Sequence, residues 1–183
     1  MPTIQLRFVE GGGWDSKVIR YTTRCRWSHT EALSEDGQKT FGAQLRGGVK
    51  WRLLADKCYR QATAYQTVQI PVAAEQYTRF WQFLTAQDGK PYDWRAILAF
   101  GMGNRDWRLP DAWFCSELDA RGLELAGIVV LPKDIPVMRI DPRDLWVLLA
   151  GKGQAPDLFG VRAPTIQSIA IVRPTFNPVV LVR

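Results

Sequence analysis

The spacing of apolar residues changes once along this 183-residue chain, and the change limits the folds open to it. Between residues 4 and 70, apolar and polar side chains alternate in short runs, as in half-buried β-strands. From residue 74 onward, apolar side chains recur every three or four positions, as on one face of an α-helix. A strand-rich first part followed by helices predicts an α+β fold.

Turn residues and capping signals divide the chain into expected elements. The expected strands are residues 4–9, 27–33, 40–45, 49–54 and 57–70, and a short helix is expected at residues 14–23. Later helices are expected at residues 74–86, from Asp93, around Cys115, and from Asp141-Pro142. Residues 165–172 and 179–182 are expected to form edge strands, because prolines interrupt that segment. No repeat or linker is visible, so we expect a single domain over residues 1–183.

The amino-acid composition limits the kinds of molecule that the protein is expected to bind. A hydrophobic fraction of 46% is that of a globular protein, and a net charge of +6 makes an anionic polymer a candidate partner. The basic residues are scattered singly, so no dedicated nucleic-acid site is expected. Three cysteines without CxxC spacing and a single histidine make a zinc site improbable, and we expect no metal and no cofactor.

Targeting signals are not visible either. Residues 1–7 lack a basic segment followed by an apolar one, and no apolar run approaches the ~18 residues of a membrane span. We therefore expect cytoplasmic synthesis without a signal peptide and no membrane span. A phage or a mobile element is a plausible source for a small protein of this kind.

The segment from Asp111 to Leu118 places a cysteine at the start of a helix. Pro110 ends any preceding helix, and Asp111 is the expected N-cap. A thiol in a first turn feels the positive end of the helix dipole, which favours the nucleophilic thiolate of Cys115. Glu117 and Asp119, just beyond it, are expected at solvated helix positions.

His29 is the one histidine of the chain and lies in an expected strand, between Ser28 and Thr30. Glu31, two residues on, shares the face of His29 if the strand is regular. A cysteine, a histidine and a polar orienting residue are the parts of a nucleophile–base–orienter arrangement. We therefore expect Cys115 and His29 to meet in the fold.

These residues also resemble a family. Ser28-His29-Thr30-Glu31, Gly47-Gly48-Val49, Tyr92-Asp93-Trp94 and Phe114-Cys115-Ser116-Glu117-Leu118, in this order, are similar to the circularly permuted NlpC/P60 papain-like group. This is its YaeF/YiiX-type branch, related to lecithin:retinol acyltransferase-like proteins. The resemblance spans roughly residues 14 to 125. It implies a papain-like core, an antiparallel sheet packed against the cysteine-bearing helix, and hydrolysis or transfer at amide or ester bonds without a cofactor.

The resemblance assigns roles to single positions. Cys115 matches the nucleophile and His29 the general base, and the third member is either Glu31 or Gln44. Residues 40–45 hold no acid, which departs from the usual pattern of the branch and leaves an inactive member open. The residues expected to contact substrate are Tyr92, Ser28, Trp113 and Ser116.

The expected activity is that of a cysteine peptidase or amidase acting on peptides of cell-wall fragments. The alternatives are an acyltransferase or lipid-ester hydrolase on the same fold, and a binding module that has lost turnover. A basic nucleic-acid-binding domain is a weaker form of the last alternative.

Overall fold

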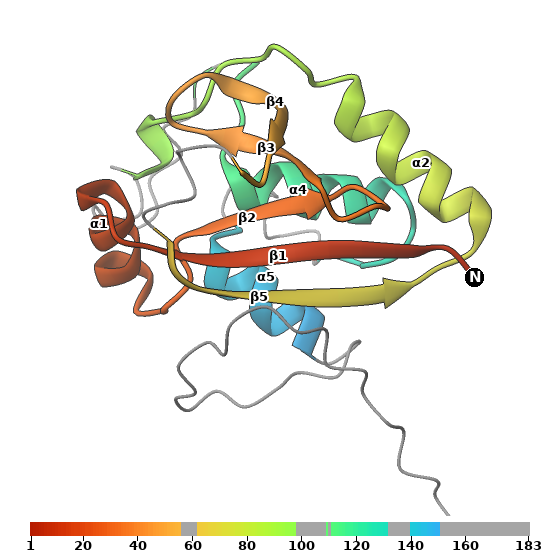
Figure 1. Ribbon diagram of the computed structural model, residues 1–183, viewed down its shortest axis with the longest axis horizontal. Helices are drawn as coiled ribbons and strands as arrows, with labels where there is room; N and C mark the ends of the chain where they lie inside the picture. The colour runs from red at the N-terminus through yellow and green to blue at the C-terminus, as the bar shows by residue number, and fades with distance from the viewer. Residues whose placement is uncertain (56–61, 98–108, 110, 132–139, 151–183) are drawn as a thin grey trace, which may run out of the picture.

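The chain folds around a five-stranded antiparallel sheet (Figure 1). The computed structural model describes residues 1–55, 62–97, 109, 111–131 and 140–150. The sheet has the strand order β4-β3-β2-β1-β5, and every neighbouring pair is antiparallel. Its strands are β1 (Thr3–Gly11), β2 (His29–Leu33), β3 (Lys39–Gln44), β4 (Gly48–Leu53) and β5 (Ala62–Pro71).

Alternation along β1 supplies much of the core. Ile4, Leu6 and Phe8 have no exposed surface, and successive side chains of a strand point to opposite faces. In the register between β1 and β2, Val9 lies opposite His29, and Arg7 lies opposite Glu31. The register thus places Arg7, Glu31 and His29 close together on strands whose other side chains form the core.

Helices cover the sheet and its ends. They are α1 (Trp14–Thr23), α2 (Ala74–Thr85), α4 (Cys115–Leu125) and α5 (Pro142–Ala150). Figure 1 shows α4 and α5 behind the sheet, and α4 contacts β2, β3 and α2. An edge-on contact between Phe8 and Trp146, with ring centroids 4.9 Å apart, packs β1 against α5. The sheet-on-helix arrangement expected for the cysteine helix is therefore present.

The expected N-cap of the cysteine helix is wrong. α4 begins at Cys115 and its N-cap is Phe114, whose N–H donates to the Glu117 carboxylate at 3.4 Å. Asp111 instead has a left-handed φ of 57°. The helix starts late because Trp113 is held in extended pairing with Tyr92. The Trp113 N–H donates to the carbonyl of Pro91 at 3.0 Å.

The other boundaries follow the sequence closely. Asp141 caps α5 as expected, since its Oδ1 accepts the Asp144 N–H at 2.9 Å. The last strand begins at Ala62 within the described residues; residues 56–61 and the expected edge strands at 165–172 and 179–182 lie outside them. Within the described residues, each helix is too short or too polar to cross a bilayer.

Candidate active site

Cys115 occupies the first position of α4, where the helix leaves its first backbone N–H groups without helical partners. Its side chain is buried at the N-terminal end of this helix. There the thiol lies beside the imidazole of His29, the first residue of β2, close enough for the two groups to interact electrostatically. The structure therefore brings together Cys115 and His29, which lie 86 positions apart in the chain (115 − 29).

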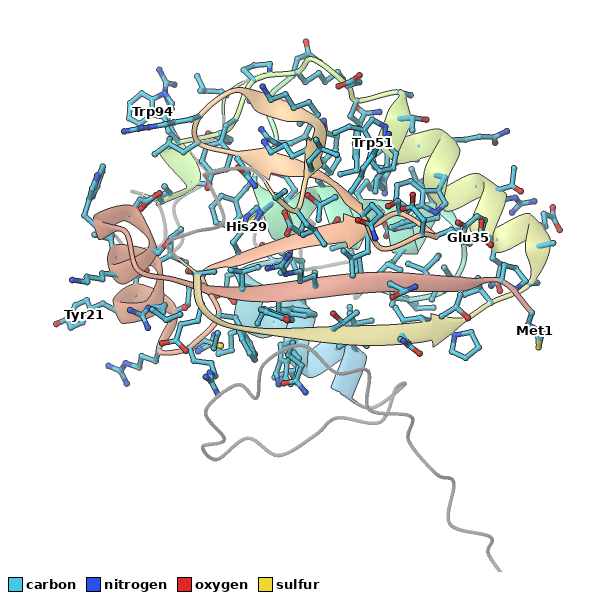
Figure 2. All side chains as sticks on the ribbon, viewed as in Figure 1. Met1, Tyr21, His29, Glu35, Trp51 and Trp94 are labelled. Carbon is cyan, nitrogen blue, oxygen red and sulfur yellow. The ribbon has the colours of Figure 1, made fainter. Side chains whose placement is uncertain are left out.

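Glu31 flanks the imidazole from the same strand. Its Oε2 lies 3.3 Å from Nε2 of His29, and its side chain is almost completely buried. Gln44 Nε2, from β3, lies 3.5 Å from the same Oε2, and Arg7 Nη1, from β1, lies 3.8 Å from Oε1. Gly42 stands beside Glu31, where a Cβ would approach the Glu31 Cβ to 3.0 Å. Residues from three neighbouring strands, β1, β2 and β3, thus surround the Glu31 carboxylate. Figure 2 labels His29 beside it.

The electrostatics favour a charged imidazole. Burial lowers the pKa of His29, but the hydrogen bonds and negative charges of Cys115 and Glu31 outweigh it and raise this pKa from 6.5 to about 10. A protonated imidazole beside a thiol is the arrangement of a thiolate–imidazolium pair.

Asp119 and Glu117 are buried, which corrects the expectation that they are solvated. Both belong to α4, which packs against β2 and β3 and also against α2, so little of this helix faces solvent. The Asp119 Oδ2 accepts a hydrogen bond from the Thr30 hydroxyl at 2.7 Å. Burial raises the pKa of Asp119 to about 7, although Thr30 and the charge of His29 act in the opposite direction.

A cleft of about 650 Å³ opens at the imidazole. Its lining comes from the glycine-rich junction between β1 and α1, from α1 itself, from the start of β2, and from the turn after β3. His29, Gln44 and Tyr92 belong to this lining, and so do the ionisable residues Asp15 and Arg46. The cleft is large enough for a few residues of a peptide.

Two of the four residues expected to contact substrate line this cleft. They are Tyr92 and Ser28, and the Ser28 hydroxyl is also bonded to β1, accepting from Gly11 N at 3.0 Å and donating to the Val9 carbonyl at 3.2 Å. Burial raises the pKa of the Tyr92 phenol, so it stays protonated and able to donate a hydrogen bond.

The other two, Ser116 and Trp113, are placed elsewhere. Ser116 is fully buried and its hydroxyl donates to the Ile140 carbonyl at 2.7 Å, which ties α4 to the segment before α5. The Trp113 indole N–H donates to Gln87 Oε1 at 3.1 Å, and its ring packs edge-on against Phe83. Neither belongs to the described cleft lining, and the contacts described for both are with other parts of the protein.

Sequence reasoning missed Arg7 and Asp119 as neighbours of the dyad. Arg7 could not be found from β1 alone, because its position beside Glu31 follows from the register between two strands. Asp119 carried a usable signal, since residues four apart lie on the same side of a helix and Asp119 follows Cys115 by four.

Comparison with known proteins finds a solved structure with a similar fold. No family model matches the chain, and no curated protein matches it. The crystal structure of the metalloprotein YiiX (DUF1105) from Escherichia coli O157:H7 is similar, with a TM-score of 0.51 and 23% identity. The fold is YiiX-like. The match covers 68% of this chain but 65% of the YiiX chain, less than two thirds of it, and at this identity it concerns the fold alone.

The description of YiiX as a metalloprotein raises the question of a metal in this chain. In the part of the chain that the structure describes, no group of three or more His, Cys, Asp or Glu side chains is arranged to hold an ion. The described residues therefore do not fit a metal.

Proposed function

We propose that this protein is a cysteine hydrolase that cleaves amide bonds on a permuted NlpC/P60-like, papain-like fold. The observation that supports it is the contact between Cys115, at the start of α4, and an imidazole flanked by the buried Glu31. The YiiX-like fold is consistent with this assignment but concerns only the arrangement of the chain.

In the proposed mechanism, His29 accepts the thiol proton. Its Nε2 faces Glu31, which leaves Nδ1 for the sulfur of Cys115. The thiolate attacks the amide carbonyl, and the backbone N–H of Cys115 is placed to stabilise the resulting oxyanion. His29 then protonates the departing amine as the acyl-enzyme forms, and water attacks the thioester to release the acid and restore the thiol.

Glu31 is the third member of the triad in this proposal. Of the two residues left open by the sequence, Glu31 has the 3.3 Å contact with the imidazole, whereas Gln44 lies 3.5 Å from Glu31. In this proposal Gln44 helps to position the Glu31 carboxylate, which its amide approaches to 3.5 Å.

The substrate class we propose is a peptide of the kind found in cell-wall fragments. Asp15 and Arg46 line the same cleft as His29, so groups of either charge on a short peptide have a complementary side chain there. The net charge of +6 would also attract an anionic wall polymer.

Turnover of purified cell-wall peptides, followed by mass spectrometry, tests this function. We expect release of a shortened peptide, a covalent acyl adduct on Cys115, and a loss of about a thousandfold or more in Cys115→Ala and in His29→Ala. Cys25→Ser is the matched control and should keep full activity. Hydrolysis that survives Cys115→Ala would contradict the proposal, and preferential cleavage of lipid esters would favour the alternative on the same dyad.

A further inference from the structure

The outward side of α1 carries three exposed apolar side chains, where an ordinary surface helix carries mainly polar ones. Trp14, Val18 and Tyr21 are 72%, 38% and 86% exposed. They follow one another at intervals of four and three residues, so they form one stripe along the helix. Tyr21 projects away from the body of the molecule (Figure 2). The inner side of the helix buries Ile19 and Thr23.

Basic side chains flank this stripe. Lys17 precedes Tyr21 by one helical turn, and Arg24 forms the C-cap of α1; both are exposed. Among the described residues, neither makes an ion pair, whereas Arg20 and Arg26 are both held by Glu10, at 2.6 and 2.9 Å. The side of α1 that carries the aromatic residues therefore also presents positive charge.

We propose that α1 docks the protein on the surface of a lipid bilayer that contains anionic lipids. Trp and Tyr side chains suit the boundary between headgroups and acyl chains, because one end of each is apolar and the other can hydrogen-bond. Lys17 and Arg24 would meet the anionic headgroups, and the net charge of +6 acts in the same direction over a longer range. This inference does not depend on the proposed hydrolase activity.

Docking by α1 would also place the cleft at the bilayer. Trp14, Asp15 and Ile19 belong both to this helix and to the lining of the cleft. This consequence, unlike the docking itself, rests on the proposed function: a substrate held at the membrane surface would reach His29 without leaving the interface.

Vesicle co-sedimentation of the full chain tests the docking surface. The probes are vesicles of phosphatidylcholine alone, and of equal parts phosphatidylcholine and phosphatidylglycerol. We expect binding to the anionic vesicles that weakens as salt is added, and little binding to the neutral ones. Val18→Ser with Tyr21→Ser should weaken binding by about tenfold per residue, and Lys17→Glu with Arg24→Glu should abolish it.

The matched control is Leu125→Ser with Val130→Ser, which removes two exposed apolar side chains, 44% and 85% exposed, from outside α1. This variant should bind like the unmodified protein, and circular dichroism should show every variant folded. Absent binding, or equal loss in the control, would overturn the proposal. So would concentration-dependent self-association that disappears in the Val18/Tyr21 variant, because the stripe would then cover a second copy of the chain.

Discussion

The two carboxylate oxygens of Glu31 face different partners. Oε2 faces His29 and Gln44, and Oε1 faces the guanidinium of Arg7. Since Glu31 is almost completely buried, its negative charge acts on the imidazole with little screening by solvent. The side chain can therefore both orient the ring and stabilise its protonated form.

We predict that Glu31→Gln lowers turnover by roughly 10- to 100-fold, because it replaces a charge-assisted hydrogen bond to His29 with a neutral one. The pKa of His29 should fall in the same variant, which titration of its imidazole proton signals by NMR would show. Gln44→Ala is the comparison variant. Its effect should be smaller, since Gln44 reaches Glu31 at only 3.5 Å. A larger effect at Gln44 would assign the orienting role to the amide.

The raised pKa of Asp119 predicts that the free energy of unfolding depends on pH. Its pKa is about 7 in the folded protein and 3.8 ordinarily, so its contribution is fully present below 3.8 and is lost as the pH rises through about 7. Asp119→Asn keeps an acceptor for the Thr30 hydroxyl but cannot ionise. Relative to the unmodified protein, the variant should gain stability between these pH values, on the order of a few kcal/mol.

Urea denaturation over a range of pH measures this difference. The stability of Asp119→Asn relative to the unmodified protein should rise from pH 4 to about pH 7 and then stay level. The contribution of His29, present below pH 6.5 and lost towards pH 10, should remain in both proteins. A difference that does not change with pH would mean that Asp119 titrates normally in the folded state.

At the scale of elements, the start of β4 depends on a glycine. Gly48 has a φ of +65°, and a Cβ there would lie 2.3 Å from the carbonyl oxygen of Lys90. That carbonyl accepts the Val49 N–H at 2.9 Å, and Gly89 N–H donates back to Val49 O at 2.9 Å. The segment before Tyr92 is thereby fixed to the sheet edge that leads to the cleft.

We predict that Gly48→Ala is clearly more destabilising than Gly37→Ala. Gly37 has a similar φ of +66° but nothing within 4 Å of its ideal Cβ, so its variant carries only the cost of the left-handed conformation. The clash at Gly48 should add about 1–3 kcal/mol, measured by denaturant unfolding. Equal losses would show that the Lys90 segment moves aside without cost.

Local sequence signals predicted the elements well. The alternation in β1, the Asp141-Pro142 start of α5 and the helix that carries Cys115 are all confirmed, because each depends on residues within a few positions of one another. The prediction of an N-cap at Asp111 was wrong, because the pairing of Trp113 with the distant Tyr92 decides where α4 begins.

At the scale of the whole molecule, the candidate site depends on contacts between distant segments. The sequence predicted that His29 and Cys115 meet, and it narrowed the orienting residue to Glu31 or Gln44. It could not predict the burial of Asp119 or the structural use of Ser116, since both follow from how α4 is enclosed by β2, β3 and α2 and by the segment before α5. Burial of a helix on several sides is a property of packing rather than of its own pattern.

The cleft likewise combines parts that no single segment contains. The β1–α1 junction, the start of β2, the turn after β3 and Tyr92 converge on one imidazole. α1 contributes Asp15 and Ile19 to the cleft wall and exposes Val18 and Tyr21, and Trp14 belongs both to the wall and to the exposed stripe. The proposed catalysis and the proposed docking can therefore be tested separately by substitution, because Val18 and Tyr21 are not part of the described cleft lining.

The rate of Cys115 alkylation by iodoacetamide as a function of pH tests the proposed dyad most directly. The measurement uses a background of Cys25→Ser and Cys58→Ser, so that a single thiol remains. We predict rapid alkylation that persists well below the ordinary thiol pKa of about 8.5, and its loss in His29→Ala. The same pH profile in both proteins, or reaction of Cys115 only on unfolding, would contradict a thiolate–imidazolium pair and make Cys115 a buried structural residue.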